Sequence, residues 1–453
     1  MTENKEVFPK LKKLLNKQVD SFEVFLLRTK AITIESQEKT VDTFKASDSS
    51  GVSLRVLKDN SPGFAFSSDI SQDALAKMAA DAVSQTSHSA KDDLLSFPDH
   101  QSLDADGLDI FDTSLGTISV DEKIKTAFAL EDAALSYDPK IKRVRNASYE
   151  EVVQEVELYN SEGNGLSFAT TRVSVGLMSI AQDGEDSQMG WDASAKIAFR
   201  DLDVAAVGRQ ASEKAVELLN ARTIESIRVP LLLDNLVTIG LLGILSSSFL
   251  GDSVEKGKSL LKGKVGKKVF SPKINIVDNG LLHGGLATAP FDGEGAPTQN
   301  TPLVEKGVCR GFLYDTYWAK RSGNTSTGNS KRGGFMVPPS VGVSNLYIEK
   351  GDTSFSKLLK EVDKGIYITE LMGLHTANPI TGDFSVGAAG FWIEDGEKTF
   401  PVRGIAISGN ILNLFSQVFA VGDDIRFLGG LGAPGIAVEG IDVSAEGDSC
   451  EQA

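Results

Sequence analysis

Residues 152–177 read VVQEVELYN, SEGNG, LSFATTRVSVGL, and this stretch decides the fold class. Two segments rich in apolar and β-branched residues, 152–160 and 166–177, flank a short turn with glycine at 163 and 165. Such a pattern predicts a long antiparallel hairpin. Helical stripes lie on both sides of it, at Ile124, Phe128 and Leu135 before the hairpin and at Val207, Ala211, Ala215 and Leu218 after it. We therefore expect helices packed on an antiparallel sheet, an α+β arrangement.

The first hundred residues repeat this pattern. A strand is predicted at 52–56, a turn at 60–63, and a helix over 75–82 that Ser71 precedes. The stretch 91–116 has little periodicity and is predicted to be a linker. We expect an N-terminal α+β unit over 1–100 and a middle α+β unit over 117–225, where Ser119 and Glu122 form a capping box. The two units could pack as one domain.

After Pro230 the composition shifts towards glycine and short apolar strands, which predicts a large, mainly β C-terminal domain over 230–448. Residues 449–453 are expected to be a tail. The longest apolar run, 236–250, is shorter than the roughly 20 residues that a membrane-spanning helix needs. It contains three serines, so we expect a buried helix.

Composition excludes several function classes. The net charge of −16 disfavours nucleic-acid binding, which depends on neutralising phosphates with lysine and arginine. The start of the chain has no apolar segment typical of a secretion signal, and the two cysteines, Cys309 and Cys450, are far apart. A cytoplasmic protein is expected.

Metal and nucleophile motifs are weak in this sequence. Its four histidines include no pair at the spacing of a helical zinc motif. A site assembled from His283, His375 and Cys309 is conceivable, although loop or packing roles suit these histidines better. The stretch 251–259 misses the phosphate-loop spacing by one residue, and residues 406–410 do not match a serine-nucleophile elbow.

Two acidic loops carry more information. Asp292 and Glu294 lie in a glycine turn that ends at Gly295, where they could bind a cation, hold an arginine or cap a helix. Asp383 ends a tight turn that also contains Asn378, Thr381 and Gly382. For both loops, turn formation is the default interpretation, and peptide binding by these residues is the alternative.

The run ITELMGLHTANPITGDFSVGAAGFWIEDG at 368–396 closely resembles the PmbA (TldE) branch of the TldD/PmbA family. Further matches lie in order through the C-terminal domain: APFDGEG at 289–295, STGN at 326–329, Pro401-Val402, ISGN at 407–410 and VGDDI at 421–425. The resemblance extends weakly upstream through the two N-terminal units. The resemblance implies a metallopeptidase family whose members act as TldD–TldE heterodimers on short or unfolded peptides. The family also includes proteins called modulators of DNA gyrase.

The family's TldD subunit carries an HExxxH helix and a C-terminal cysteine that hold zinc. Alignment on residues 250–252 places the motif positions of this chain at Leu242, Gly243 and Ser247, and the cysteine position near Ala433. None of these side chains can replace imidazole or thiolate. The resemblance therefore implies no metal or other cofactor in this chain, with zinc expected in a TldD-like partner, and no peptidase activity without that partner.

Three functions remain open at this stage. The first is a TldE/PmbA-like subunit that pairs with a TldD-like zinc peptidase and helps to hold extended peptides. The second is a stand-alone homodimer that binds peptides or modulates gyrase. The third is a metal-independent hydrolase that uses Asp292, Glu294 or Asp383, although no nucleophile–base pair is visible.

Overall fold

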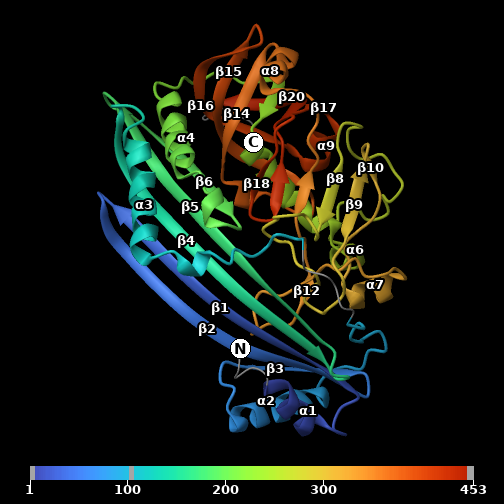
Figure 1. The fold of residues 1–453 in the computed structure, drawn as a ribbon. Coiled ribbons are helices and arrows are strands. Elements are labelled where there is room, and N and C mark those ends of the chain that lie inside the picture. The colour runs from blue at the N-terminus through green and yellow to red at the C-terminus, as the bar shows by residue number, and fades with distance from the viewer. Residues whose placement is uncertain (1–5, 101–106, 446–453) are drawn as a thin grey trace.

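The N-terminal half is built on one long antiparallel sheet. The computed structural model describes residues 6–100 and 107–445, so the predicted tail at 449–453 and Cys450 lie outside the described residues. The sheet has six strands in the order β3-β2-β1-β4-β5-β6 (Figure 1). Its strands are β1 (Ser21–Gln37), β2 (Thr40–Lys58), β3 (Ser61–Ser67), β4 (Ile141–Asn160), β5 (Gly165–Asp183) and β6 (Asp186–Lys196).

Pairing between β1 and β4 joins the two predicted N-terminal units into this single sheet. The register runs from Glu23 opposite Asn160 to Ser36 opposite Ala147. The predicted hairpin at 152–177 is present as β4 and β5, and the predicted strand at 52–56 is the last part of β2. The polar first part of β2, residues 40–50, lacks apolar alternation and forms a strand because it pairs along β1.

Four helices cover one face of the sheet. Val24 and Leu26 of β1 point towards α1 (Val7–Leu15) and α2 (Gln72–Thr86), which build a core at one end. At the other end α3 (Val120–Leu135) and α4 (Val204–Glu217) pack on β4 and β5. Ser71 and Ser119 accept the backbone N–H groups of Ala74 and Glu122, so both predicted caps are present. Phe25, between Val24 and Leu26, packs on Phe291 of the C-terminal half, so that half covers the opposite face.

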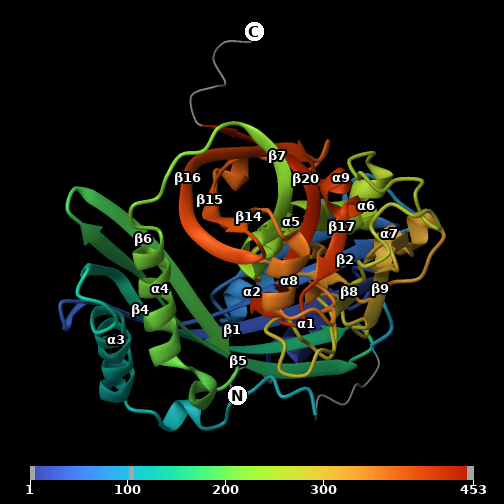
Figure 2. The same cartoon turned by 90° about the horizontal axis from the view of Figure 1, so that it is seen from above.

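The C-terminal half contains a barrel. Its sheet has the order β16-β15-β14-β7-β20-β17, and β16 also pairs with β20, which closes the ring that Figure 2 shows along its axis. Of the strand pairs described for this sheet, β14 with β7 is parallel and the others are antiparallel. The strands are β7 (Ile227–Leu233), β14 (Gly365–Met372), β15 (Asp383–Glu394), β16 (Glu397–Asn410), β17 (Val418–Val421) and β20 (Ile436–Ala445).

A second C-terminal sheet lies beside the barrel, in the order β10-β9-β8-β13-β19-β18. The predicted fold class, α+β with a mainly β C-terminal region, is confirmed. The strands are β8 (Ile276–Asn279), β9 (Asn300–Glu305), β10 (Val308–Cys309), β13 (Leu346–Ile348), β18 (Arg426–Leu428) and β19 (Leu431–Ala433), with a separate pair β11 (Ser330–Lys331) and β12 (Ser340–Val341). The helices are α5 (Asn235–Ser246), α6 (Gly251–Glu255), α7 (Thr316–Ser322), α8 (Phe355–Val362) and α9 (Ile411–Ser416).

Helix α5 is the buried helix that the apolar run at 236–250 predicts. The Asp234 carboxylate caps its first turn by accepting the N–H of Leu236 at 3.0 Å. Most of its side chains are buried in the C-terminal core, but Gly240 and Gly243 are only half-buried. Among the described residues, none of the helices is long and apolar enough to cross a membrane.

The described parts of the predicted linker, 91–100 and 107–116, make contacts with both halves of the protein. Asp92 accepts the Tyr317 hydroxyl at 2.8 Å, and Phe97 lies against the Arg55 guanidinium. The carbonyl of Ile110 accepts the N–H of Thr171 at 3.0 Å. This connection therefore adds to the contact between the two halves.

Candidate functional site

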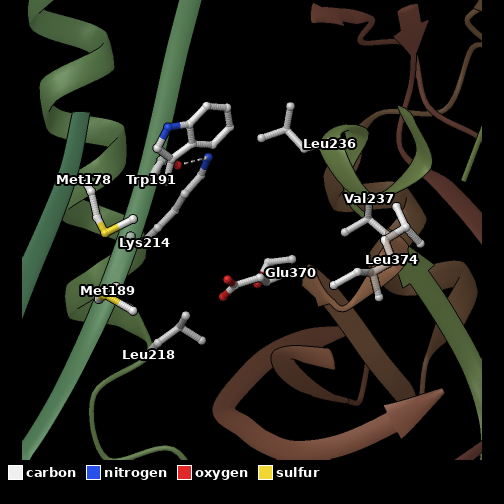
Figure 3. A pocket seen from close by; sticks show the side chains of 12 residues that line it. Met178, Met189, Trp191, Lys214, Leu218, Leu236, Val237, Glu370 and Leu374 are labelled. Carbon is white, nitrogen blue, oxygen red and sulfur yellow. Dashed lines mark hydrogen bonds between the residues drawn. The ribbon is translucent and has the colours of Figure 1, made fainter. Parts of the chain in front are cut away.

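A cleft runs along α5 between the N-terminal sheet and the barrel. It consists of two adjoining hollows that share Leu374, and we call them together the α5 cleft. The first hollow has a volume of about 310 Å³ and is shown in Figure 3; the second has about 440 Å³ and is more open. The first is lined from the N-terminal half by Met178, Met189, Gly190, Trp191, Lys214 and Leu218, and from the C-terminal half by Leu236, Val237, Thr369, Glu370, Leu371 and Leu374. The second is lined by Gly240, Gly243, Ile244, Ser247, Leu374, His375, Ala377 and Pro379.

The first hollow is mostly apolar and carries two charged side chains on opposite walls. Glu370 of β14 reaches in from the C-terminal side and Lys214 of α4 from the N-terminal side (Figure 3). Desolvation raises the pKa of Glu370, and Lys214 acts in the opposite direction. Met189 and Trp191 are 56% and 42% exposed, which is high for large apolar side chains inside a cleft. Exposed methionine and tryptophan are typical of surfaces that bind flexible partners.

A buried ion pair holds the wall of the first hollow to the C-terminal half. Asp192 of β6 has a side chain that is 1% exposed, and its Oδ1 accepts both Lys214 and Arg426 at 2.8 Å. Lys214 also donates to the carbonyl of Trp191 at 3.2 Å, and Arg426 donates to the carbonyl of Ala193 at 2.8 Å. Arg426 belongs to β18, so this cluster connects the two halves beside the cleft.

The four positions that the resemblance aligns with the zinc motif and its C-terminal cysteine divide into two pairs. Gly243 and Ser247 line the second hollow, whereas Leu242 and Ala433 are fully buried in the core. A hydrogen atom, a hydroxyl and two alkyl groups do not form a donor set that fits zinc.

The alternative site from His283, His375 and Cys309 is not assembled either. His283 is exposed in a turn, His375 lines the second hollow, and Cys309 is buried in β10, where burial raises its pKa. Across residues 6–100 and 107–445, the structure contains no group of three or more His, Cys, Asp or Glu side chains that could hold a metal ion.

Asp292 organises the loop at 291–295. Its Oδ1 accepts the N–H groups of Glu294 and Ala296 at 2.9 and 3.0 Å, and its Oδ2 accepts that of Ser330 at 2.9 Å. Gly295 has a φ of +85°, which favours glycine, and a Cβ there would lie 2.6 Å from ring atoms of His100. These contacts assign Asp292 and Gly295 to turn formation.

Glu294 instead takes part in a polar cluster between the two halves. Its carboxylate accepts Arg55 at 3.0 Å and the backbone N–H of Thr316 at 3.2 Å. Arg55 also pairs with Glu23 at 3.5 Å, and Glu23 pairs with Arg332, whose Nε donates to the carbonyl of Gly293 at 2.6 Å. We call Glu23, Arg55, Glu294 and Arg332 the junction cluster. The sequence left three roles open for Glu294: binding a cation, holding an arginine or capping a helix. In the structure Glu294 holds an arginine, Arg55.

The junction cluster is absent from the sequence-based expectations, although one signal for it exists. Glu23 follows Phe22 and precedes Val24 and Phe25 in a strand that is otherwise apolar. A charged residue on the buried face of such a strand needs a buried counter-charge. The sequence could have raised that question, but it could not identify Arg332, which lies more than 300 positions away.

Asp292 makes the folding stability depend on pH. Burial and the neighbouring Glu294 raise its pKa to about 7, against the ordinary value of about 3.9, while its three N–H donors act in the opposite direction. The folded protein therefore keeps a proton that the unfolded chain releases. The stability that this proton contributes is fully present below about pH 4 and is lost as the pH rises through about 7.

We expect the wild-type protein to lose stability relative to Asp292→Asn between pH 5 and pH 7, by about 1 kcal/mol per pH unit. Denaturant unfolding of both proteins at pH 5, 6, 7 and 8 measures the difference. Two parallel pH profiles would contradict the raised pKa.

The loop at 378–383 forms a tight turn beside the barrel. The side-chain oxygen of Asn378 accepts the N–H groups of Ile380 and Thr381 at 2.9 and 3.2 Å, and Gly382 has a φ of +80°. Asp383 accepts the amide of Asn410 at 2.9 Å, and this contact lowers its pKa. Asp383 is therefore bonded to β16, whereas Asp292 and Glu294 lie against the N-terminal sheet. The hydrolase alternative names Asp292, Glu294 or Asp383, and these three carboxylates do not converge on one site.

Comparison with known proteins gives consistent matches along the whole chain. Residues 22–86, 113–219 and 226–445 match in turn domain 1, the central domain and the C-terminal domain of PmbA/TldA metallopeptidases. The metalloprotease PmbA of Escherichia coli O157:H7 is 30% identical over 410 residues, which cover 90% of this chain and 88% of that protein.

Solved structures agree with these matches. A crystal structure from Thermotoga maritima, described as a candidate modulator of a DNA gyrase, superposes with a TM-score of 0.88 at 28% identity, covering 97% of this chain and 100% of the other. TldE from Thermococcus kodakarensis superposes with a TM-score of 0.90 over 97% of this chain and 100% of the other. At 24% identity this second likeness concerns the fold alone.

Proposed function

The chain belongs to the PmbA/TldD metallopeptidase family as a PmbA-like and TldE-like member, and on that premise we propose that it is the non-metal-binding subunit of a TldD–TldE-type peptidase complex. Its role is to hold a short or unfolded peptide in an extended form, while a TldD-like partner supplies zinc. The zinc would activate water for hydrolysis in the partner.

The observation that carries the proposal concerns the side chains that α5 presents to the cleft. Gly243 and Ser247 line the second hollow, at the positions where the resemblance places zinc chemistry in TldD. Neither side chain is a zinc ligand, and neither fills the hollow as a bulky residue would. The helix therefore leaves an open path along the cleft.

The contacts of the cleft suit side-chain recognition more than strand addition. The outer edge of β6 borders the first hollow, but the carbonyls of Trp191 and Ala193 already accept Lys214 and Arg426. Cations placed along an edge strand are a common way to block further strand pairing. A peptide would then be held chiefly through apolar contacts with Met178, Met189 and Leu374.

Metal analysis and a peptidase assay test this proposal. Purified alone, the chain should bind no stoichiometric zinc and should cleave no unfolded peptide. Co-expressed with a TldD-like partner, it should co-purify and give cleavage that a chelator abolishes. Chelator-sensitive cleavage by the chain alone would overturn the assignment, as would full activity of the partner without this chain.

A second candidate function is a stand-alone homodimer that binds peptides or modulates gyrase. It is favoured by the description of the Thermotoga maritima structure as a candidate modulator of a DNA gyrase. Affinity purification from cells that contain both possible partners separates the two functions. Recovery of gyrase without a TldD-like protein would support the second, and recovery of a TldD-like protein would support the first.

A further inference from the structure

Glu370 is a carboxylate inside an apolar hollow without a direct counter-ion. It belongs to β14, which forms the C-terminal wall of the first hollow (Figure 3). Over the two described ranges of the chain, its carboxylate makes no hydrogen bond or ion pair. Glu370 is an exposed residue of β14, so its carboxylate is accessible and offers unused acceptor capacity to a ligand.

Lys214 is not the missing counter-ion, although it lies on the opposite wall. Its ammonium pairs with Asp192 at 2.8 Å and donates to the carbonyl of Trp191 at 3.2 Å. Figure 3 shows the ammonium turned to Trp191, whereas the Glu370 carboxylate points into the hollow. Two of the three ammonium donors are thus already used, while all acceptor sites of Glu370 are open. The hollow is therefore better prepared for a cation than for an anion.

The other walls suit a long side chain with an apolar stem. Met178, Met189 and Leu374 surround the space between the two charged residues. Methionines adapt to stems of different shape, and the exposed indole of Trp191 is available for a cation–π contact. A volume of about 310 Å³ is large enough for one such side chain. The net charge of −16 also attracts cationic peptides over long range.

We propose that the first hollow is a specificity pocket for a lysine or arginine side chain of the bound peptide, and that Glu370 receives its charge. The pocket deepens the proposed function and rests on it, because it names the substrate class as peptides with a basic residue. Glu370 acts as a specificity-determining residue and takes no part in bond cleavage.

Binding measurements on the full chain test the pocket. Fluorescence anisotropy would use unstructured peptides with acetylated and amidated ends, identical except for one position that carries lysine, arginine, norleucine or glutamate. Norleucine matches the lysine stem without its ammonium. We expect the lysine and arginine peptides to bind about tenfold more tightly than the norleucine peptide, as for one charge-assisted contact that water partly screens.

Three variants separate recognition from a structural effect. Glu370→Gln should remove the preference for lysine over norleucine, and Glu370→Lys should reverse it in favour of the glutamate peptide. Glu305→Gln, which changes an exposed glutamate on β9 in the other sheet, should keep the preference of the wild type.

The outcomes distinguish this inference from the proposed function. Equal binding of lysine and norleucine peptides would overturn the pocket and leave the peptide-holding role intact. A preference that appears only in peptides with a free amino terminus would overturn the side-chain assignment. Failure of every peptide to bind would instead contradict the proposed function itself.

Discussion

Replacing Arg332 by methionine should lower the free energy of unfolding by about 3–5 kcal/mol, the range found when one partner of a buried ion pair is removed. The Arg332 and Glu23 side chains are 4% and 1% exposed. The variant leaves Glu23 with Arg55 at 3.5 Å as its remaining ion-pair partner, and it leaves the carbonyl of Gly293 without the Arg332 donor. It also removes the guanidinium that lies over the Phe25 ring.

Denaturant unfolding measures this change, and Arg228→Met is the matched control. Arg228 pairs with Asp442 at 2.7 Å, but both side chains are more than half exposed. Removing such a surface pair should cost no more than about 1 kcal/mol. A double variant, Glu23→Gln with Arg332→Met, should recover part of the loss because it removes a buried carboxylate that has lost one of its two arginine partners. If Arg332→Met were as stable as the control, the junction cluster would not hold the two halves together.

Gly243→Trp should reduce peptide binding at least tenfold while leaving the fold intact. Gly243 lies in the middle of α5 and lines the second hollow. A Cβ at this position meets only a Leu431 methyl at 3.4 Å, so the larger side chain can extend into the cleft. Any residue other than glycine or proline also improves helix propensity, by up to about 1 kcal/mol.

Peptide affinity and thermal unfolding together decide the outcome. Gly116→Trp serves as the control, because Gly116 is exposed and open space surrounds its Cβ position. The control should bind peptide like the wild type. A Gly243→Trp protein that unfolds at the wild-type temperature and still binds peptide with wild-type affinity would show that the peptide does not pass along α5. In the reconstituted complex the same variant should slow cleavage.

Local sequence patterns predict much of the fold. The hairpin at 152–177, both serine caps and the buried helix at 236–250 follow from turn chemistry, capping and hydrophobic periodicity. The first part of β2 could not be predicted in this way, because its polar residues form a strand only through their pairing with β1. Barrel closure is equally non-local, since β16 pairs with a strand more than 35 residues further along the chain.

The candidate site could be predicted only in part. The resemblance identifies α5 and the positions at 243 and 247, which line the cleft in the structure. The first hollow draws Trp191, Lys214 and Glu370 from three separate elements, and none of them stands out in the sequence alone. The acidic loops attract attention in the sequence, yet their carboxylates are engaged in turn formation and domain contacts.

The pairing of β1 with β4 also bears on how the chain is made. After α2 has been synthesised, its helix pair and the first three strands can assemble, but one edge of β1 stays unpaired until β4 has emerged about 75 residues later. At translation rates of about 5–20 residues per second, that edge remains open for roughly 4–15 seconds. An unpaired strand with an apolar face is an aggregation hazard. We therefore expect the nascent chain to depend on ribosome-associated chaperones during this interval, and a fragment ending near residue 100 to aggregate when expressed alone.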